Sequence, residues 1–215
     1  MRISSSSNRP RRHPSRTLLL TLSFGLAATL SACGDETKDD AGQDPEVQVA
    51  DLLLSARDLP EGWGDSNSQG VDYRVTVCGV DLEPSAPAKA VSARFSQGPL
   101  GPFLEQHVRV YEDDVAREVV AELQQALPDC TGYEAKGSAP HSPTARFDVE
   151  PLTVEGAPAD SVAWRQTSRG DLPITSDLLL VPHGNTAVML MSYALRDNPD
   201  PGVLEQAVAS LPAAP

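Results

Sequence analysis

The sequence predicts an α+β fold in which a single, largely antiparallel, curved sheet is flanked by helices. Several short segments alternate apolar and polar residues with a period of two, which is typical of strands with one buried face. Three longer segments repeat apolar residues with a helical period behind Asp and Pro start signals. The strand segments follow one another through short links, which favours antiparallel pairing. The expected order is helix, three strands, helix, four strands, helix.

Each expected helix has a recognisable beginning. Asp44 and Asp200 can cap a first and a last helix, because each is followed by Pro at the first helical position. These helices cover 45–54 and 201–211. The middle helix, 114–127, carries one apolar stripe and ends before Pro128.

The expected strands form two groups on either side of the middle helix. They cover 71–77, 91–96 and 104–110 in the first group, and 145–149, 162–164, 178–181 and 186–195 in the second. Leu104, Val108 and Val110 alternate with Glu105, His107 and Arg109, so 104–110 is expected to bury one face. The last two strands are apolar throughout, which predicts central strands covered on both faces and joined as a hairpin by 182–185.

The first 32 residues have the form of a bacterial lipoprotein signal peptide. Five arginines precede Leu18–Leu30, an apolar run too short to span a bilayer, which needs about 20 residues. Leu30-Ser31-Ala32-Cys33 then matches a lipobox. We therefore expect cleavage before Cys33, a diacylglycerol thioether on its sulfur and a palmitate-type anchor on the extracytoplasmic face of the cell membrane. An ordinary secretory peptide cut elsewhere is the alternative, and Arg11-Arg12 leaves a twin-arginine export route open.

Three segments follow from this interpretation. Residues 1–32 form the signal peptide, 33–44 the lipidated Cys and a disordered acidic linker, and 45–215 a single extracytoplasmic domain. The chain has 17 Lys and Arg against 30 Asp and Glu, and five Arg but no acid lie in 1–32, so the remainder would carry a charge of −18. Such a surface repels phosphates, which argues against nucleic acid as a partner.

Cysteine usage predicts one disulfide. If Cys33 carries lipid, Cys78 and Cys130 are the remaining thiols, and both face an oxidising exterior where disulfides persist. We therefore expect Cys78 and Cys130 to pair.

A search for catalytic and metal-binding patterns finds none, and no cofactor is implied. The sequence has neither a G-x-S-x-G elbow nor an H-E-x-x-H motif. Three histidines of the domain stand alone: His107, expected as a solvated surface residue, His141 and His183. Asp148 and Glu150 could form a carboxylate pair, although two acids on one strand face are usually solvent-exposed charge. Trp63 and Trp164 are expected in the core rather than in a sugar-binding groove.

Several short strings resemble the extracellular sensor domain of actinobacterial receptor serine/threonine kinases and related lipoproteins. They are Leu52-Leu53-Leu54-Ser55, Val108-Arg109-Val110-Tyr111 leading into a helix that ends at Cys130, and Gly184-Asn185 before a late apolar strand. The similarity spans roughly 46–211. It implies a ligand-binding sensor module with an α+β fold, a cleft and two intramolecular disulfides. This chain offers Cys78 and Cys130 for one bridge, and it has neither a kinase nor a transmembrane helix, so signalling would require a partner.

The sequence therefore favours a membrane-anchored, sensor-like binding module for an unknown small molecule or envelope protein. A secreted, lipid-anchored hydrolase with an unrecognised active site is the alternative, and an accessory envelope protein is a third possibility.

The lipobox interpretation predicts a modified cysteine. Mass spectrometry of the membrane fraction should find an N-terminal Cys33 bearing a diacylglycerol group, and Cys33→Ser should release the protein from that fraction because the thioether cannot form. A water-soluble protein with a free Cys33 thiol would rule out the anchor.

Overall fold

The computed structural model describes residues 45–67, 76–136, 144–195 and 197–213, with only the backbone of 45–48 described. The expected signal peptide, Cys33, the linker, most of the strand expected at 71–77, and His141 therefore lie outside the described residues.

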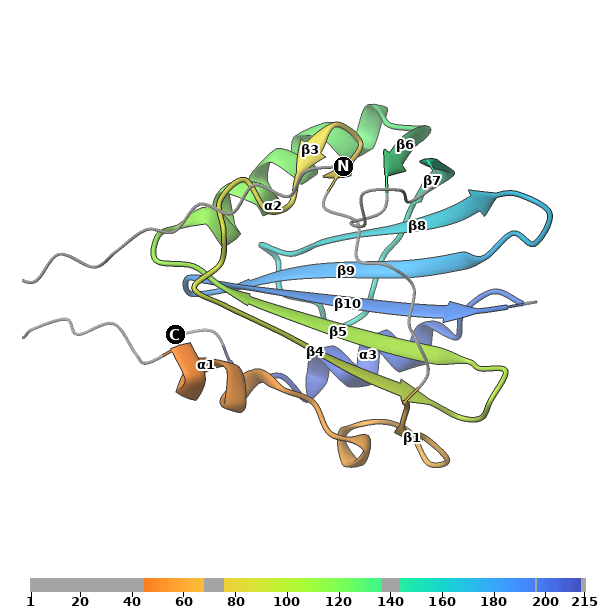
Figure 1. Ribbon diagram of the computed structural model, residues 1–215, viewed down its shortest axis with the longest axis horizontal. Helices are drawn as coiled ribbons and strands as arrows, with labels where there is room; N and C mark the ends of the chain where they lie inside the picture. Colours follow the sequence, from red (N-terminus) through yellow and green to blue (C-terminus); the bar gives the residue numbers. More distant parts are fainter. Residues whose placement is uncertain (1–44, 68–75, 137–143, 196, 214–215) are drawn as a thin grey trace, which may run out of the picture. The chain divides into compact units, whose positions relative to one another are not determined.

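One antiparallel sheet of eight strands dominates the described chain, in the order β1-β4-β5-β10-β9-β8-β7-β6 (Figure 1). Its strands are β1 Gly64–Asp65, β4 Lys89–Ser96, β5 Phe103–Val110, β6 Gly132–Lys136, β7 Thr144–Pro151, β8 Val162–Arg169, β9 Thr175–His183 and β10 Thr186–Ala194. A separate two-stranded sheet pairs β2 Thr76–Val77 with β3 Val80–Asp81. The predicted α+β class, with helices against an antiparallel sheet, is confirmed.

Helices cover both faces of the large sheet. On one face, α1 Pro45–Leu52 and α3 Pro201–Ala209 pack against an apolar core that includes Leu104, Val108 and Leu190. On the other face, α2 Val115–Ala126 packs against a second core around Trp164 and Met189. Because successive side chains of a strand point to opposite faces, each central strand contributes to both cores.

Packing on both faces of the sheet explains the burial of three strands. The expectation that β9 and β10 are covered on both faces is confirmed, since all but their end residues are buried. The expectation of one exposed face was wrong for β5, where only Arg109 is not fully buried. Glu105 and His107 lie on the same face of β5 as Phe103, which belongs to the core beneath α2, so these polar side chains lie inside the protein.

The three helices begin and end close to the expected positions. The side chain of Asp200 accepts a hydrogen bond of 3.0 Å from Gly202 N at the start of α3. The end of α1 is held by Gln106 of β5, whose amide donates to Leu52 O at 2.8 Å and accepts from Leu54 N at 2.9 Å. A fully buried amide thus satisfies backbone groups that the end of a helix leaves without partners.

The sequence interpretation missed three strands. β1 and β3 have two residues each, too few for a period to be visible. β6 pairs with β7 at an edge of the sheet. At Gly132 a Cβ atom would lie 2.6 Å from Phe147 O, so this glycine permits the close approach of the two strands.

The predicted disulfide between Cys78 and Cys130 is present. Cys78 lies in the turn between β2 and β3 with a positive φ of 52°, and Cys130 follows η2 Leu127–Asp129 at the end of α2. The bridge therefore ties the small sheet to the end of α2.

Breaking this bridge should weaken the fold. The cysteines are 52 residues apart in the sequence, and closing a loop of that length stabilises by about 4 kcal/mol in the chain-entropy model. Urea unfolding of the oxidised protein, compared with the reduced protein and with Cys78→Ser/Cys130→Ser, should show a loss of that order. Equal midpoints, together with two titratable thiols before reduction, would contradict the bridge.

Candidate functional site

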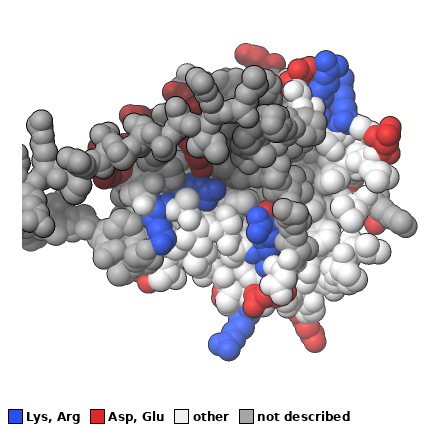
Figure 2. Space-filling model, in the orientation of Figure 1, with Lys and Arg blue, Asp and Glu red and all other residues white. Residues whose placement is uncertain are grey.

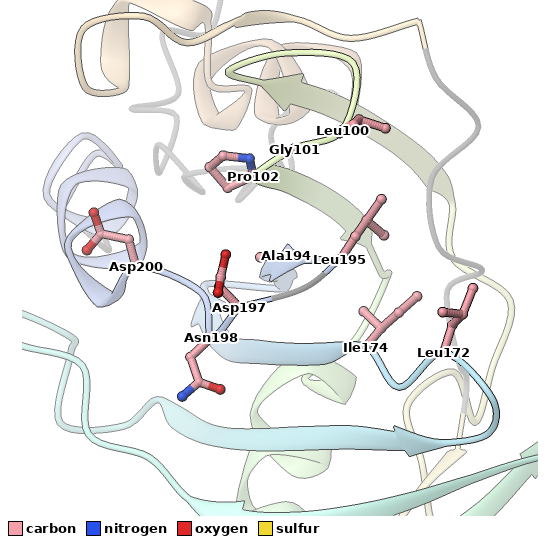
Figure 3. A pocket seen from close by; sticks show the side chains of 10 residues that line it. All are labelled: Leu100, Gly101, Pro102, Leu172, Ile174, Ala194, Leu195, Asp197, Asn198 and Asp200. Atoms are coloured by element: carbon pink, nitrogen blue, oxygen red, sulfur yellow. The ribbon is translucent and has the colours of Figure 1, made fainter.

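A hollow of about 570 Å³ lies at one end of the large sheet, and we call it the strand-end pocket (Figure 3). It lies where the β4–β5 and β8–β9 connections meet the segment between β10 and α3, at the right of Figure 1. Its lining residues are Leu100, Gly101, Pro102, Leu172, Ile174, Ala194, Leu195, Asp197, Asn198 and Asp200. The volume falls within the range of about 300 to 1,000 Å³ that is common for small-molecule sites.

Exposed apolar side chains gather at this pocket. Among the described residues, the large apolar side chains that stand exposed are Leu172, Leu100 and Leu195, with 84%, 72% and 40% of their surface accessible. All three line the strand-end pocket. In the space-filling view of Figure 2, uncharged surface covers much of this end of the molecule. Such clustering is typical of binding surfaces, whereas single exposed leucines are ordinary.

The β4–β5 loop has a backbone that favours glycine at one pocket position. Gly101 has a φ of 91°, a conformation that side chains other than glycine rarely adopt. A Cβ atom there would also lie 2.6 Å from the ring of Phe103. Gly101 therefore lets the loop fold closely over Phe103 at the wall of the pocket.

The β8–β9 hairpin is fixed by hydrogen bonds beside the pocket. Ile174 N donates to the Ser168 hydroxyl, and Ser168 N donates to Ile174 O, each at 2.9 Å. The hydroxyls of Thr167 and Thr175 lie 3.1 Å apart across the same hairpin. This bonding holds Ile174 against the apolar core, while Leu172 extends from the tip into solvent.

The pocket has an apolar side and an acidic side. Figure 3 shows Leu172, Ile174 and Leu195 together on one side, and Asp197 and Asp200 on the other. The described lining residues include these two carboxylates and no Lys, Arg or His. The arrangement can hold an apolar group next to a hydrogen-bond donor or a positive charge.

A second notable feature is a buried polar cluster on β4, β5 and β10. Glu105 accepts a hydrogen bond of 2.8 Å from the Tyr193 hydroxyl and another of 3.3 Å from Arg94 Nε. The Ser92 hydroxyl lies 2.7 Å from His107 Nδ1 in a hydrogen bond. These hydrogen bonds offset the free-energy cost of burying polar groups inside the protein.

The expectation that His107 is a solvated surface residue was wrong, since it is only 2% exposed. It occupies a central strand, where it pairs in register with Ser92 of β4 and Met189 of β10. The pattern of alternating charges could not reveal that this face of the sheet is covered by other parts of the protein.

The cluster places a hydroxyl, an imidazole and a carboxylate in sequence. His107 Nε2 lies 3.5 Å from Glu105 Oε2, beyond ordinary hydrogen-bonding distance, whereas Ser92 is close to the other ring nitrogen. An imidazole at this distance from a serine hydroxyl can accept its proton. The same carboxylate also accepts hydrogen bonds from Arg94 and Tyr193.

The pocket and the polar cluster share a structural connection. The ring of Phe103, at the end of the β4–β5 loop, stacks on the ring of Tyr193 with centroids 5.0 Å apart. The Tyr193 hydroxyl in turn donates a hydrogen bond to Glu105. Movement of the loop around Gly101 would therefore disturb the contacts of Tyr193 with the cluster.

The other residues singled out in the sequence occupy separate places. Asp148 is paired with Arg169 on the exposed part of β7 and β8, and this ion pair lowers the Asp148 pKa below its ordinary value. Glu150 is also exposed, so no carboxylate pair faces an enclosed site there. Trp63 and Trp164 are both buried, and the core interpretation is confirmed for both.

His183 lies at the end of β9, where Nε2 is 3.1 Å from Ala213 O. Within the described part of the chain, no three His, Cys, Asp or Glu side chains gather as a metal site would require.

Two further hollows are smaller. One of about 310 Å³ lies between the end of α2 and strands β7 and β8, and includes Leu127 and Trp164. Another of about 360 Å³ lies over β6 and β7 beside Arg146 and Arg169. Both arginines are engaged there, by Glu134 and Asp148 respectively.

In the view of Figure 2, the Lys and Arg side chains of the described residues form separate groups with uncharged surface between them. None of the helices in the described ranges combines the length and the apolar character needed to cross a membrane.

Comparison with known proteins finds similar solved structures and no matching family. No family model matches the chain, and no curated protein matches it either. Among solved structures, the chain is similar to the extracellular domain of PknH from Mycobacterium tuberculosis, with 16% identity and a TM-score of 0.43 over 60% of this chain and 67% of that one. At that TM-score, the likeness does not bear on what this protein binds or does.

The sequence search missed the pocket because its residues belong to three separate connections. Leu100 stands among Gly and Pro in 98–102, and Leu172 stands between Asp and Pro in 171–173. A leucine in such a turn cannot reach the core easily, and this was the available signal.

Proposed function

We propose that the protein is a membrane-anchored, extracytoplasmic binding module with a sensor-like role, and that the strand-end pocket is its ligand site. The gathering of Leu100, Leu172 and Leu195 around a single hollow carries this proposal. Exposed apolar area at one place costs free energy in the free protein, and a ligand that covers it removes that cost.

The position of the pocket is compatible with an anchor at Cys33. In Figure 1, α1 begins at Pro45 at the end of the sheet opposite the strand-end pocket. A chain anchored at Cys33 would join the described domain at Pro45, and we propose that this attachment leaves the pocket open to molecules in the envelope.

A sensor also needs a response that a partner can read. A ligand that shifts the β4–β5 loop would move Phe103 against Tyr193, and through it the hydrogen bond to Glu105. The stacked rings of Phe103 and Tyr193 have few alternative arrangements. A small movement at the pocket can therefore shift side chains on β5 and β10. We propose that an envelope protein reads this change.

Binding can be tested with a neutral apolar probe. N-acetyl-dileucine amide should show a single saturable site by isothermal titration calorimetry, and Leu172→Ser should weaken it by about tenfold, since an apolar contact contributes about 1 to 3 kcal/mol. Native mass spectrometry of the protein extracted from membranes should find a retained small molecule in the same site.

The control is Leu127→Ser, which replaces a partly buried leucine at the hollow beside α2, with its melting temperature measured to check that the fold is kept. It should leave the affinity unchanged. If Leu127→Ser weakens the probe instead, or if the protein binds neither the probe nor a retained molecule, the pocket is not the functional site.

A hydrolase is the second candidate, favoured by the 2.7 Å contact between Ser92 Oγ and His107 Nδ1. In such an enzyme His107 would accept the Ser92 proton as the hydroxyl attacks an ester carbonyl and would return it to the departing alcohol. Water would then hydrolyse the acyl-serine to release the acid and restore the hydroxyl. Turnover of p-nitrophenyl acetate, lost in Ser92→Ala and retained in Ser96→Ala on the same strand, would support it. Equal rates for both variants and the unchanged protein would exclude Ser92 as a nucleophile.

A further inference from the structure

The division of the strand-end pocket into an apolar and an acidic side restricts its ligand. Asp197 is exposed, and Figure 3 shows its side chain on the side of the pocket across from the leucines. Asp200 lies beside it at the start of α3, where Oδ1 accepts the hydrogen bond from Gly202 N. The Asp197 carboxylate is therefore the better placed of the two to accept hydrogen bonds from a ligand.

The acidic side of the pocket argues against two partners that exposed leucines would otherwise favour. These are a second copy of this chain and an anionic lipid surface. In a two-fold symmetric contact, a second copy of this chain would bring its own Asp197 and Asp200 to the same interface, and like charges that meet in a desolvated contact destabilise it. An anionic lipid surface would meet the same two carboxylates. The excess of acids over bases in the chain as a whole opposes both occupants further.

The size of the strand-end pocket favours a small molecule over a protein surface as its ligand. A hollow of about 570 Å³ encloses a compact ligand, whereas protein interfaces are usually broad and rather flat. No aromatic residue lines the pocket within the described chain, so a cation would be recognised there by carboxylates rather than by ring faces.

We infer that the strand-end pocket binds a small amphiphilic cation, with a branched aliphatic body against Leu100, Leu172 and Leu195 and an ammonium group at Asp197. This inference rests on the proposed function and specifies its ligand class. The ammonium donates hydrogen bonds to the Asp197 carboxylate, and the aliphatic body covers the exposed leucines.

Three probes of closely similar shape and different charge test the inference. Dileucine amide carries a free ammonium, N-acetyl-dileucine amide is neutral, and N-acetyl-dileucine is an anion. The full chain is held in lipid nanodiscs, with empty nanodiscs as the blank, and each probe is titrated by calorimetry. Dileucine amide should bind at least about tenfold more tightly than the neutral probe, and the anion should bind most weakly. Added salt should reduce the difference, because exposed charges are screened.

Three variants test which residue of the protein recognises the ammonium group. Asp197→Asn should bring dileucine amide to the affinity of the neutral probe, whose own binding should not change. Asp129→Asn, at an exposed acid of η2 outside the pocket, should preserve the preference for the cation. Arg196 lies outside the described residues, and Arg196→Gln should keep or strengthen the binding of dileucine amide.

The outcomes separate this inference from the proposed function. Equal binding of the cationic and neutral probes would overturn the cation while leaving a ligand pocket in place. A preference that survives Asp197→Asn, that Asp129→Asn abolishes, or that Arg196→Gln weakens would likewise overturn it. If no probe binds and no retained molecule is found, both proposals fail together.

Discussion

The structure depends on covering both faces of the central strands. β5, β10 and β9 lie in the middle of an eight-stranded sheet, with α1 and α3 on one face and α2 on the other. Nearly every side chain of these strands is buried, so polar residues are tolerated there only with partners. The burial of apolar area on both faces therefore provides the stability, and it also dictates where polar chemistry can occur.

Three polar groups inside the sheet show how this constraint is met. Gln106 is fully buried and closes the end of α1 through two backbone hydrogen bonds. Asp177 of β9 is fully buried as well and receives a bidentate ion pair from Arg165 of β8, at 2.6 and 2.8 Å. Glu105 is held by Tyr193 and Arg94. Removing a single partner would leave a buried charge or amide unsatisfied, so each of these groups fixes the register of its neighbours.

The same constraint places the candidate ligand site at the ends of the strands. Both faces of the sheet centre are filled, whereas the connections between strands are free to carry residues that the core does not need. Gly101 and Asp200 shape these connections through backbone conformation and helix capping. Leu172 and Leu100 can stay exposed there without disturbing the packing. The stacking of Phe103 on Tyr193 nevertheless connects this end to the buried cluster.

The sequence by itself determined the fold class, the three helices, the central apolar strands and the pairing of Cys78 with Cys130, because periodicity, capping residues and cysteine counting are local or compositional signals. Tertiary structure alone decided that His107 is buried, since alternation in β5 cannot show that the sheet face carrying its polar side chains is covered. It also decided the strand-end pocket, because residues from three connections meet only when the sheet order is fixed. Pairing across a sheet joins residues distant in the chain, and no local pattern records which strands become neighbours.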